Sequence, residues 1–518
     1  MQALRVAVHG AAPRLSAALA GYGLEIVDAS RAEVVVAVDH DVELGGSPVL
    51  LLGPVGPGPL ADAAGLLPGR LLPVHEVRVR AGRDAGQVAA RWPAPFVPLR
   101  GAFRLVEKLA DDVEQLLTAN VARTDHPLAT WRPATGVGVL GLSADDHAEP
   151  ARLALLVRVL RHLAGRRDGP PVPVGMLGYG AIGHEHALAL AAVDGLELAA
   201  VCDPEPTRIA AAHAYAPDLT GHADGSALLD DDAVELVIVS TPPSTHAEWV
   251  LRALEAGKHV VVEKPFCLTV AQADRQIAAA AEAGLLLAVY QNRRWDRDFL
   301  ALRAAVRTGR IGELFHLESF VGGYEHPCNF WHSDVEVSGG HLYDWGSHYL
   351  DQILELLPQP VTWVSATAHK RVWHDVTNAD HTRVLLHFDD GAEAEFTASD
   401  LAAARKPKWY VLGTTGAVVG DWQQERVVRR SPIGLAEEDR FAVADSPAAM
   451  SLMTPDGSRT HLALPAAPAQ PFHRELADAL LAGAPMSVTP AASRRTIAVM
   501  QAATASAADG GRPVVPRA

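Results

Sequence analysis

Short apolar runs alternate with helical patterns along the first 165 residues. The runs "RVAVHG", "LEIVDA", "EVVVAVD", "PVLLLGPV" and "GVGVLGL" have β character, and the spacing of "AFRLVEKLADDVEQLLTA", residues 102–119, predicts a helix. Such alternation is typical of a parallel α/β layer. Gly, Arg and Pro then replace the periodic apolar positions at residues 165–173, which we interpret as a linker.

A second alternation runs from residue 172 to about residue 290. The strand patterns "VPVGMLG", "LELAAVCD", "VELVIVST" and "HVVVEKP" alternate with the helix patterns "HEHALALAAV" and "THAEWVLRALEAG". Beyond residue 291, helices mix with the alternating runs "LFHLESFVGG", "TWVSATAH", "TRVLLHFDD" and "AEAEFTAS", which predict an open antiparallel sheet. A helix at residues 471–483 is expected to precede a polar tail.

The composition is that of a soluble globular protein, with 49% hydrophobic and 20% charged residues. A net charge of −16 argues against nucleic acid or an anionic membrane as the main partner. The cysteines Cys202, Cys267 and Cys328 are too few for a disulfide framework or a thiolate metal site. The chain shows no signal segment and no apolar run near the ~18 residues of a membrane span, so we expect a cytoplasmic protein.

The stretch "VGMLGYGAIGHEHA" places Gly178, Gly180 and Gly183 in the spacing G-x-G-x-x-G, after a strand and at the start of a helix. With Asp203 twenty residues beyond Gly183 at a strand end, this context predicts dinucleotide binding. Gly178 permits the tight turn, Gly180 lets the backbone approach the pyrophosphate, and Gly183 lets the helix pack on the strand. Asp203 favours the ribose of NAD, whereas Arg208 could turn toward the 2′-phosphate of NADP. The alternative is an α/β turn without a ligand.

Lys264 is one of only six lysines against 39 arginines, and it stands between a glutamate and a proline in "VVVEKPFC". A lysine can share a proton near neutral pH once burial lowers its pKa, which an arginine cannot do. Lys264 is therefore a candidate for chemistry.

Asp344 and His348 stand four residues apart in "VSGGHLYDWGSHYLDQILELL" and are predicted to project from one helix face, with His341 one turn earlier. A carboxylate beside an imidazole suits proton transfer, because the Asp orients a substrate hydroxyl while the His takes its proton. Two alternatives remain: a capped, solvated helical pair, and a metal site formed by His341, Asp344 and His348.

The ordered motifs "GYGAIG", "VCDPEP", "STPPSTH", "EKP", "YQNRRWDRDF" and "GGHLYDWGSHYLDQ" resemble the Gfo/Idh/MocA family of nicotinamide-dependent sugar and polyol oxidoreductases over residues 172–518. The resemblance implies an α/β fold: a Rossmann dinucleotide-binding domain, residues 172–290, and an α+β domain with an open, mostly antiparallel sheet, residues 291–518. An extra α/β domain, residues 1–165, precedes them. The resemblance to the family also implies a homodimer or homotetramer.

By the same resemblance, Lys264 reaches the nicotinamide ribose and the substrate, while Asp344 and His348 bind the reacting hydroxyl and His348 accepts its proton. The cofactor-binding candidates are Gly178, Gly180, Ala181, Ile182, Gly183, Asp203, Arg208, Thr241, Pro242, His246, Glu263, Lys264 and Asn292. The substrate-binding candidates are Lys264, Arg293, Tyr324, Trp331, His341, Asp344 and His348. A structural role is an alternative for Thr241 and Asn292, and packing or capping is one for His246.

Two features depart from the family pattern. His341 replaces a third glycine and could narrow the pocket or add a hydrogen-bond donor. Residues 322–340, rich in aromatic side chains and histidine, are interpreted as the substrate-facing loop, with a packed loop as the alternative.

The first domain faintly resembles the trehalose-utilisation, glutamine-amidotransferase-like fold, but residues 1–201 lack the cysteine that such a nucleophile needs. It is expected to be degenerate, structural or regulatory.

The sequence thus predicts an oxidoreductase that transfers hydride between a CH–OH group of a sugar, inositol or related polyol and NAD, with NADP possible and no resident metal. One alternative is a retained cofactor that supports elimination, epimerisation or glycoside cleavage. Another is a sensor that binds a sugar or dinucleotide without catalysis.

Overall fold

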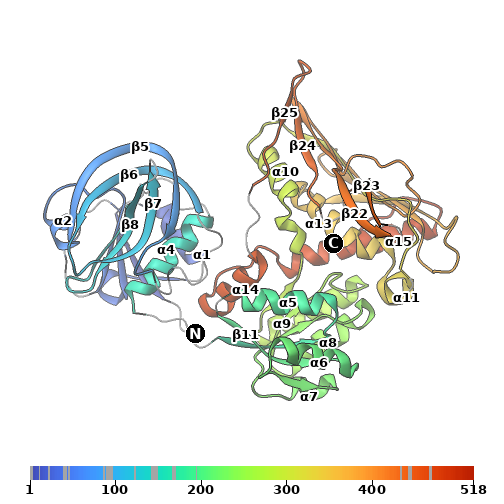
Figure 1. The fold of residues 1–518 in the computed structure, drawn as a ribbon, viewed down its shortest axis with the longest axis horizontal. Helices are drawn as coiled ribbons and strands as arrows, with labels where there is room; N and C mark the ends of the chain where they lie inside the picture. Colours follow the sequence, from blue (N-terminus) through green and yellow to red (C-terminus); the bar gives the residue numbers. More distant parts are fainter. Residues whose placement is uncertain are drawn as a thin grey trace. The chain divides into compact units, whose positions relative to one another are not determined.

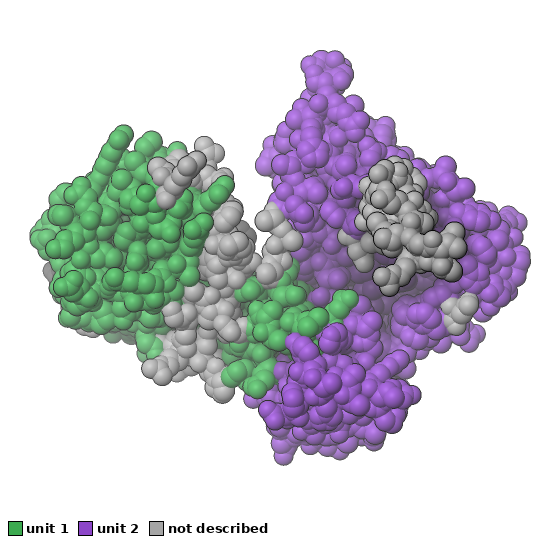
Figure 2. Space-filling view, viewed as in Figure 1, with its two compact units in different colours: residues 1–172, 185–197, 468–487 green, residues 173–184, 198–467, 488–518 purple. Residues whose placement is uncertain are grey.

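The computed structural model describes residues 4–10, 12–21, 24–38, 42, 44, 47–85, 88, 97–121, 124–141, 150–165, 171–193, 195–328, 330–431, 434–441, 446–465 and 470–517. The chain forms two compact units, coloured separately in Figure 2. The first comprises residues 1–172, 185–197 and 468–487, and the second residues 173–184, 198–467 and 488–518. Of the predicted linker, residues 166–170 lie outside the described residues.

A nine-stranded sheet in the order β2-β1-β3-β4-β9-β8-β7-β5-β6 forms the first unit (Figure 1). Its strands are β1 Arg5–His9, β2 Glu25–Ile26, β3 Val34–Ala37, β4 Val49–Leu52, β5 Leu66–Ala81, β6 Val97–Leu109, β7 Glu114–Val121, β8 Thr124–Arg132 and β9 Val137–Leu140. The strands β2, β1, β3, β4 and β9 are parallel, as the apolar runs predicted, and the rest pair antiparallel. The helices are η1 Ala29–Arg31, α1 Pro13–Gly21, α2 Pro59–Ala63, α4 Pro150–Leu163 and α14 Pro471–Ala482.

The helix predicted at residues 102–119 is wrong: this stretch supplies most of β6 and β7. Both strands pair with β5, from Leu66↔Leu109 to Ala81↔Leu117, and this pairing buries Phe103 and Leu116. The local spacing also fits a helix, but pairing with a distant strand overrides local preference. The likeness of this region to an amidotransferase-like fold stays a prediction.

A six-stranded sheet in the order β12-β11-β10-β13-β14-β15 begins the second α/β region. Its strands are β10 Val172–Leu177, β11 Leu196–Cys202, β12 Thr220–His222, β13 Leu236–Val239, β14 His259–Val262 and β15 Leu287–Val289. The connecting helices are α5 Ala181–Ala191, α6 Pro206–Tyr215, α7 Gly225–Leu229, η3 Pro243–Thr245, α8 His246–Glu255 and α9 Val270–Ala283. The strand order reverses between β10 and β13, and ligands of open α/β sheets bind beyond the carboxyl ends of strands at such a point.

The eight-stranded sheet that follows has the order β17-β18-β19-β16-β20-β21-β24-β25 and is antiparallel except for β16 beside β19, which confirms the predicted fold class. Its strands are β16 Leu314–Gly322, β17 Val361–His369, β18 His381–Phe388, β19 Glu393–Ser399, β20 Trp409–Gly413, β21 Gly416–Asp421, β24 Ala449–Met453 and β25 Arg459–His461; β22 Gln424–Ser431 and β23 Gly434–Phe441 form a hairpin. The helices are η4 Asn292–Trp295, α10 Arg297–Arg307, η5 Trp331–Ser333, α11 Val335–Ser338, α12 His341–Asp344, α13 Gly346–Leu356 and α15 Pro490–Ala508.

The polar tail expected after residue 483 is wrong, because α15 occupies most of it. Thr489 caps this helix by accepting a hydrogen bond from the Ala492 N–H, and Ile497, Val499 and Met500 are buried. The helix lies against α13 and β17. Many of its Ala, Ser and Thr residues, which suggest an exposed tail in the sequence, therefore pack in the core. Within the described residues, no helix is long and apolar enough to cross a membrane.

Two lysines two residues apart in sequence differ strongly in burial. Lys408 is 1% exposed, and its Nζ lies 2.8 Å from Oδ2 of the buried Asp298. Lys406 is about half exposed and pairs with Glu318 and with the buried Glu395, which keeps a second cation, Arg383.

We expect Lys408→Met to lower the free energy of unfolding by about 3–5 kcal/mol, because it leaves the Asp298 carboxylate buried without its cation. The matched change Lys406→Met should cost less than about 1 kcal/mol, as exposed pairs do. Chemical denaturation of both variants measures the difference. Equal losses would contradict this account of the Lys408 pair.

Candidate active site

The three glycines of the predicted dinucleotide loop lie between β10 and α5, and each has a different backbone environment. Gly178 has a φ of +89°, and a Cβ there would lie 2.5 Å from the Ser240 carbonyl oxygen. A Cβ on Gly183 would lie 2.6 Å from the Gly178 carbonyl oxygen. A Cβ on Gly180 would meet nothing within 4 Å, so this glycine faces open space. The loop therefore has a tight turn, a close helix contact and a free backbone face, which together fit a bound dinucleotide.

Ala181 and Ile182 are exposed in the first turn of α5, where backbone N–H groups are available to an anion. Asp203, at the end of β11, is 1% exposed and accepts hydrogen bonds from the N–H groups of Tyr179 at 2.8 Å and Glu205 at 2.9 Å. Arg208 Nη1 lies 3.2 Å from the same carboxylate. Asp203 thus ties the end of β11 to the glycine loop, and the arginine that could meet a 2′-phosphate contacts Asp203.

The loops after β13 and β14 are joined by His246. Its Nε2 lies 2.8 Å from the Thr241 carbonyl oxygen and its Nδ1 lies 2.8 Å from that of Pro265. Burial lowers the pKa of this imidazole, although the two carbonyl contacts act to raise it. Both nitrogens face backbone, which places His246 behind the loops as a link between them. The Thr245 hydroxyl in turn contacts the Thr241 hydroxyl at 2.8 Å and the Pro242 carbonyl oxygen at 2.8 Å.

Lys264 and Asp344 meet directly, although they are 80 residues apart in sequence. The distance from Lys264 Nζ to Asp344 Oδ1 is 2.6 Å, and the side chains are 22% and 30% exposed, so a ligand can reach the pair. Glu263 accepts a hydrogen bond from the Lys264 N–H at 3.0 Å and so fixes the loop backbone. Burial acts to raise the pKa of Asp344, but the positive charge of Lys264 and the nearby imidazoles outweigh it, so the pKa is lowered.

The single helix predicted through Asp344 and His348 is two helices, α12 and α13, which meet at Trp345. Trp345 keeps right-handed helical dihedrals, φ −79° and ψ −36°, so the chain continues in nearly the same direction. His348 is 5% exposed, and its pKa is lowered well below the ordinary value by burial and by the charges of Lys264 and Arg293. Its Nδ1 is buried without a hydrogen-bond partner. The imidazole is therefore neutral and able to accept a proton.

Arg293 follows the exposed Asn292 in η4, and its side chain approaches the same helix pair. The Arg293 guanidinium lies 5.2 Å above the Trp345 ring, and Nη1 lies 3.3 Å from Asp296 Oδ2. Burial raises the pKa of Asp296 to about 6. The structure thus brings Lys264, Arg293, Asp344 and His348 into one electrostatic environment.

The aromatic residues of the predicted substrate loop are exposed rather than packed in a core: Tyr324 is 55% exposed and Trp331 is 36% exposed. Tyr324 makes an edge contact with Trp373 at 5.9 Å between ring centroids. His341 Nε2 lies 3.6 Å from Asp400 Oδ1, and its Nδ1 is buried without a hydrogen-bond partner.

Sequence reasoning did not select His332, whose ring stacks on Trp331 with centroids 3.5 Å apart. Burial lowers the His332 pKa, and the charges of Asp344 and Lys264 also act on it, which places the imidazole near that pair. Its Nδ1 is buried and has no hydrogen-bond partner. The adjacency of Trp331 and His332 in the loop was the sequence feature that could have pointed to His332. Among the described residues, no group of three His, Cys, Asp or Glu side chains has the arrangement of a metal site.

We expect Gly180→Ala and Gly183→Ala to separate ligand binding from folding. Gly180→Ala should leave the melting temperature of the free protein unchanged and weaken NAD binding at least about tenfold, because its methyl group would occupy the space facing the pyrophosphate. Gly183→Ala should lower the melting temperature, because its Cβ would overlap the Gly178 carbonyl oxygen. Thermal unfolding with and without NAD measures both effects, and an unstable Gly180→Ala protein would contradict the assignment.

Comparisons with known proteins agree with this geometry. Residues 172–291 match the family "Oxidoreductase family, NAD-binding Rossmann fold", and residues 299–419 match the "GFO/IDH/MocA C-terminal domain". The chain is 33% identical over 268 residues to the uncharacterized oxidoreductase YdgJ of Escherichia coli, covering 49% of this chain and 74% of YdgJ. It is 28% identical over 352 residues to the scyllo-inositol 2-dehydrogenase (NADP(+)) IolW of Bacillus subtilis, covering 66% and 96%. The crystal structure of an NAD-binding protein from Listeria innocua superposes with a TM-score of 0.56 at 28% identity, covering 67% of this chain and all of that one. The chain therefore belongs to the Gfo/Idh/MocA family of NAD(P)-dependent oxidoreductases.

Proposed function

We propose that this enzyme oxidises a ring hydroxyl of a sugar, inositol or related polyol, with NAD as the preferred hydride acceptor. The observation that carries the proposal is the contact between Lys264 and Asp344 beside a neutral, buried His348. The relationship to IolW supports a cyclic polyol as substrate. Asp203, whose carboxylate would repel a 2′-phosphate, supports NAD over NADP.

The glycine loop, Asp203 and the loops at Thr241 and Glu263 would hold the dinucleotide at the carboxyl ends of β10 and β13. When bound, its nicotinamide ring supplies the hydride acceptor. Lys264 would reach both the nicotinamide ribose and the substrate. The remaining work belongs to the protein's own side chains, which bind, orient and deprotonate the substrate hydroxyl.

His348 removes the hydroxyl proton as the C–H bond breaks, because a neutral imidazole with a lowered pKa is already in its basic form at pH 7. Asp344 positions the hydroxyl so that its proton faces His348 rather than the carboxylate. Lys264, held at 2.6 Å from Asp344, stabilises negative charge that develops on the substrate oxygen. Arg293, His341 and the exposed rings of Tyr324 and Trp331 would contact the remainder of the ring.

The direct test is absorbance of reduced nicotinamide with NAD or NADP and a panel of inositols, aldoses, sugar acids and glycosides. We expect sustained reduction of NAD with one polyol class. His348→Ala should lower kcat by about 10²–10⁴-fold, as loss of a general base does. Lys264→Met should lower kcat by about 10²-fold, the usual cost of one electrostatic group.

Both variants should still bind NAD, measured by the increase in melting temperature. Near-normal turnover by either variant would contradict the assigned roles. Reduction limited to one equivalent of enzyme would instead indicate a reaction in which the cofactor stays bound.

The pH dependence of kcat/KM should have an acid limb below pH 6.5, the ordinary pKa of histidine. The sign follows from the role of His348: the deprotonated imidazole is the active form, so the rate rises with pH through its pKa. Because burial and two cations lower that pKa, the limb lies on the acid side and the rate is level near pH 7. An acid limb centred at pH 7 or above would contradict this assignment.

A further inference from the structure

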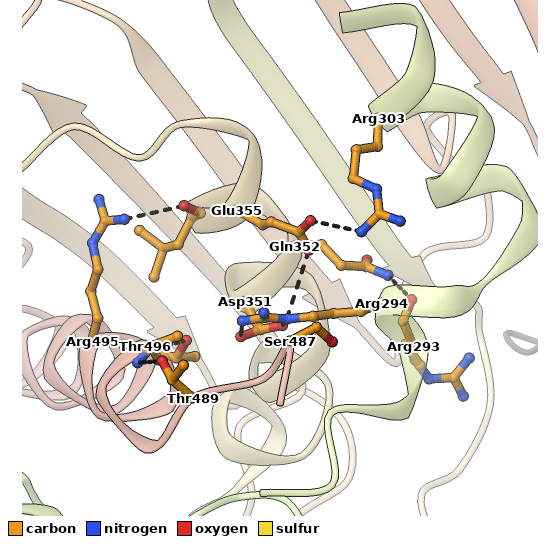
Figure 3. Close-up of polar contacts among 12 residues, drawn as sticks. Arg293, Arg294, Arg303, Asp351, Gln352, Glu355, Ser487, Thr489, Arg495 and Thr496 are labelled. Atoms are coloured by element: carbon orange, nitrogen blue, oxygen red, sulfur yellow. Dashed lines mark hydrogen bonds and ion pairs between the residues drawn. The ribbon is translucent and has the colours of Figure 1, made fainter. Parts of the chain in front are cut away.

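We propose that Arg294, Asp351 and Gln352 form a clamp that positions His348 relative to Arg293, and that its purpose is catalytic geometry rather than stability. This proposal rests on the proposed role of His348 as the proton acceptor. Figure 3 shows the clamp between η4, which carries Arg293 and Arg294, and α13, which carries the other members.

The central contact of the clamp is a two-bond ion pair between Arg294 and Asp351. Arg294 Nε lies 2.6 Å from Asp351 Oδ2, and Nη2 lies 2.6 Å from Oδ1. Arg294 is 8% exposed and Asp351 is 2% exposed. Two parallel bonds between planar groups fix the rotation of one segment about the other, which a single bond does not.

The neighbouring residue adds a second attachment. Gln352 Nε2 donates a hydrogen bond of 2.5 Å to the Arg293 carbonyl oxygen. Consecutive residues of η4 are therefore fixed to consecutive residues of α13, one through its backbone and one through its side chain. Because the hydrogen bond from Gln352 holds the Arg293 backbone against α13, the Arg293 guanidinium reaches the Trp345 ring and Asp296.

The helix α13 is also fixed at its carboxyl end. Arg495 of α15 donates hydrogen bonds to the carbonyl oxygens of Leu354 at 3.1 Å and Leu357 at 3.3 Å, where the negative end of a helix attracts a cation. His348 stands one turn before Asp351 on this helix. Movement of η4 against α13 would therefore change the position of Arg293 relative to His348, with the helix itself held in place.

Stability alone does not account for such a pair. Removing two charges from water costs about as much as their attraction returns, so well-packed apolar residues of the same size would stabilise the fold at least equally. An apolar pair would lack the two parallel, directional hydrogen bonds that join Arg294 to Asp351. Trp345 lies between Arg293 and His348: the Arg293 guanidinium is 5.2 Å above its ring, and the His348 ring centroid is 6.3 Å from it. The charge of Arg293 also lowers the pKa of His348, so the relative position of the two residues affects the base.

The test compares Arg294→Lys with Arg303→Lys. Lysine keeps the charge at residue 294 but cannot form the two-bond contact. Arg303 provides the control, because it pairs with Oε1 of Glu355 on the same helix at 2.8 Å and has no bond to Asp351. Arg294 Nε lies 3.7 Å from the other Glu355 oxygen, so the control also shows whether that shared contact matters. Gln352→Met, which removes only the hydrogen bond to the Arg293 carbonyl, serves as a second clamp variant in case Arg294→Lys does not fold.

The readout that needs no turnover is deuterium exchange at the imidazole C2 position of His348 as a function of pH, measured by mass spectrometry with fragmentation that resolves it from His341. We expect the His348 pKa to rise by roughly half a unit or more in Arg294→Lys and Gln352→Met, because Arg293 is no longer held beside it. In the same variants kcat should fall about tenfold or more, as a small misplacement of reacting groups does, with KM for NAD unchanged. Arg303→Lys should change neither quantity.

An unchanged His348 pKa in both clamp variants would overturn the proposal, as would an equal change in Arg303→Lys, since the network would then only stabilise the fold. If the unaltered enzyme reduces NAD with none of the polyols, the proposed function fails instead. The exchange measurement still decides whether the clamp positions His348.

Discussion

The burial of α13 on all sides is the constraint on which the rest of the site depends. Ser347, His348, Asp351 and Gln352 lie inside the protein, and buried polar groups require partners. Arg294 pairs with Asp351, the Arg293 carbonyl accepts from Gln352, and Tyr343 accepts from the Ser347 hydroxyl. The Tyr343 carbonyl belongs to the preceding turn, but the two arginines come from a segment more than 50 residues away, so the need to satisfy one helix fixes η4 against it.

The same burial sets the chemistry of His348. Burial deprives His348 of the hydration that favours its charged form, and two nearby cations, Lys264 and Arg293, oppose that form further. The group is thus kept neutral without a carboxylate partner of its own. Asp344, which could have supplied one, is engaged by Lys264 instead. This division keeps Asp344 charged and His348 neutral, as the proposed roles in orientation and proton transfer require.

In the Rossmann domain, the constraint is the close approach of two backbone segments, the turn after β10 and the end of β13. The turn at Gly178 lies against Ser240, so the loops after β10 and β13 share one edge with no room for side chains between them. His246 extends this edge to the loop that carries Lys264, by facing the carbonyl oxygens of Thr241 and Pro265. The glycine loop, the loop at Thr241 and the loop that carries Lys264 are thereby linked to one another.

The sequence by itself determined the features that depend on local spacing. The G-x-G-x-x-G loop, the alternation of strand and helix over residues 172–290 and the four-residue spacing of Asp344 and His348 are all local patterns, and the fold class derived from the sequence is confirmed. Tertiary structure decided what depends on distant partners. Residues 102–119 became strands because β5 pairs with them, and α15 formed because α13 and β17 cover it. The pairing of Arg294 with Asp351, 57 residues apart, has no local signature, and the adjacent Trp331 and His332 do not reveal that His332 lies near Lys264, because side chains are brought together by packing whose energy is spread over the whole core.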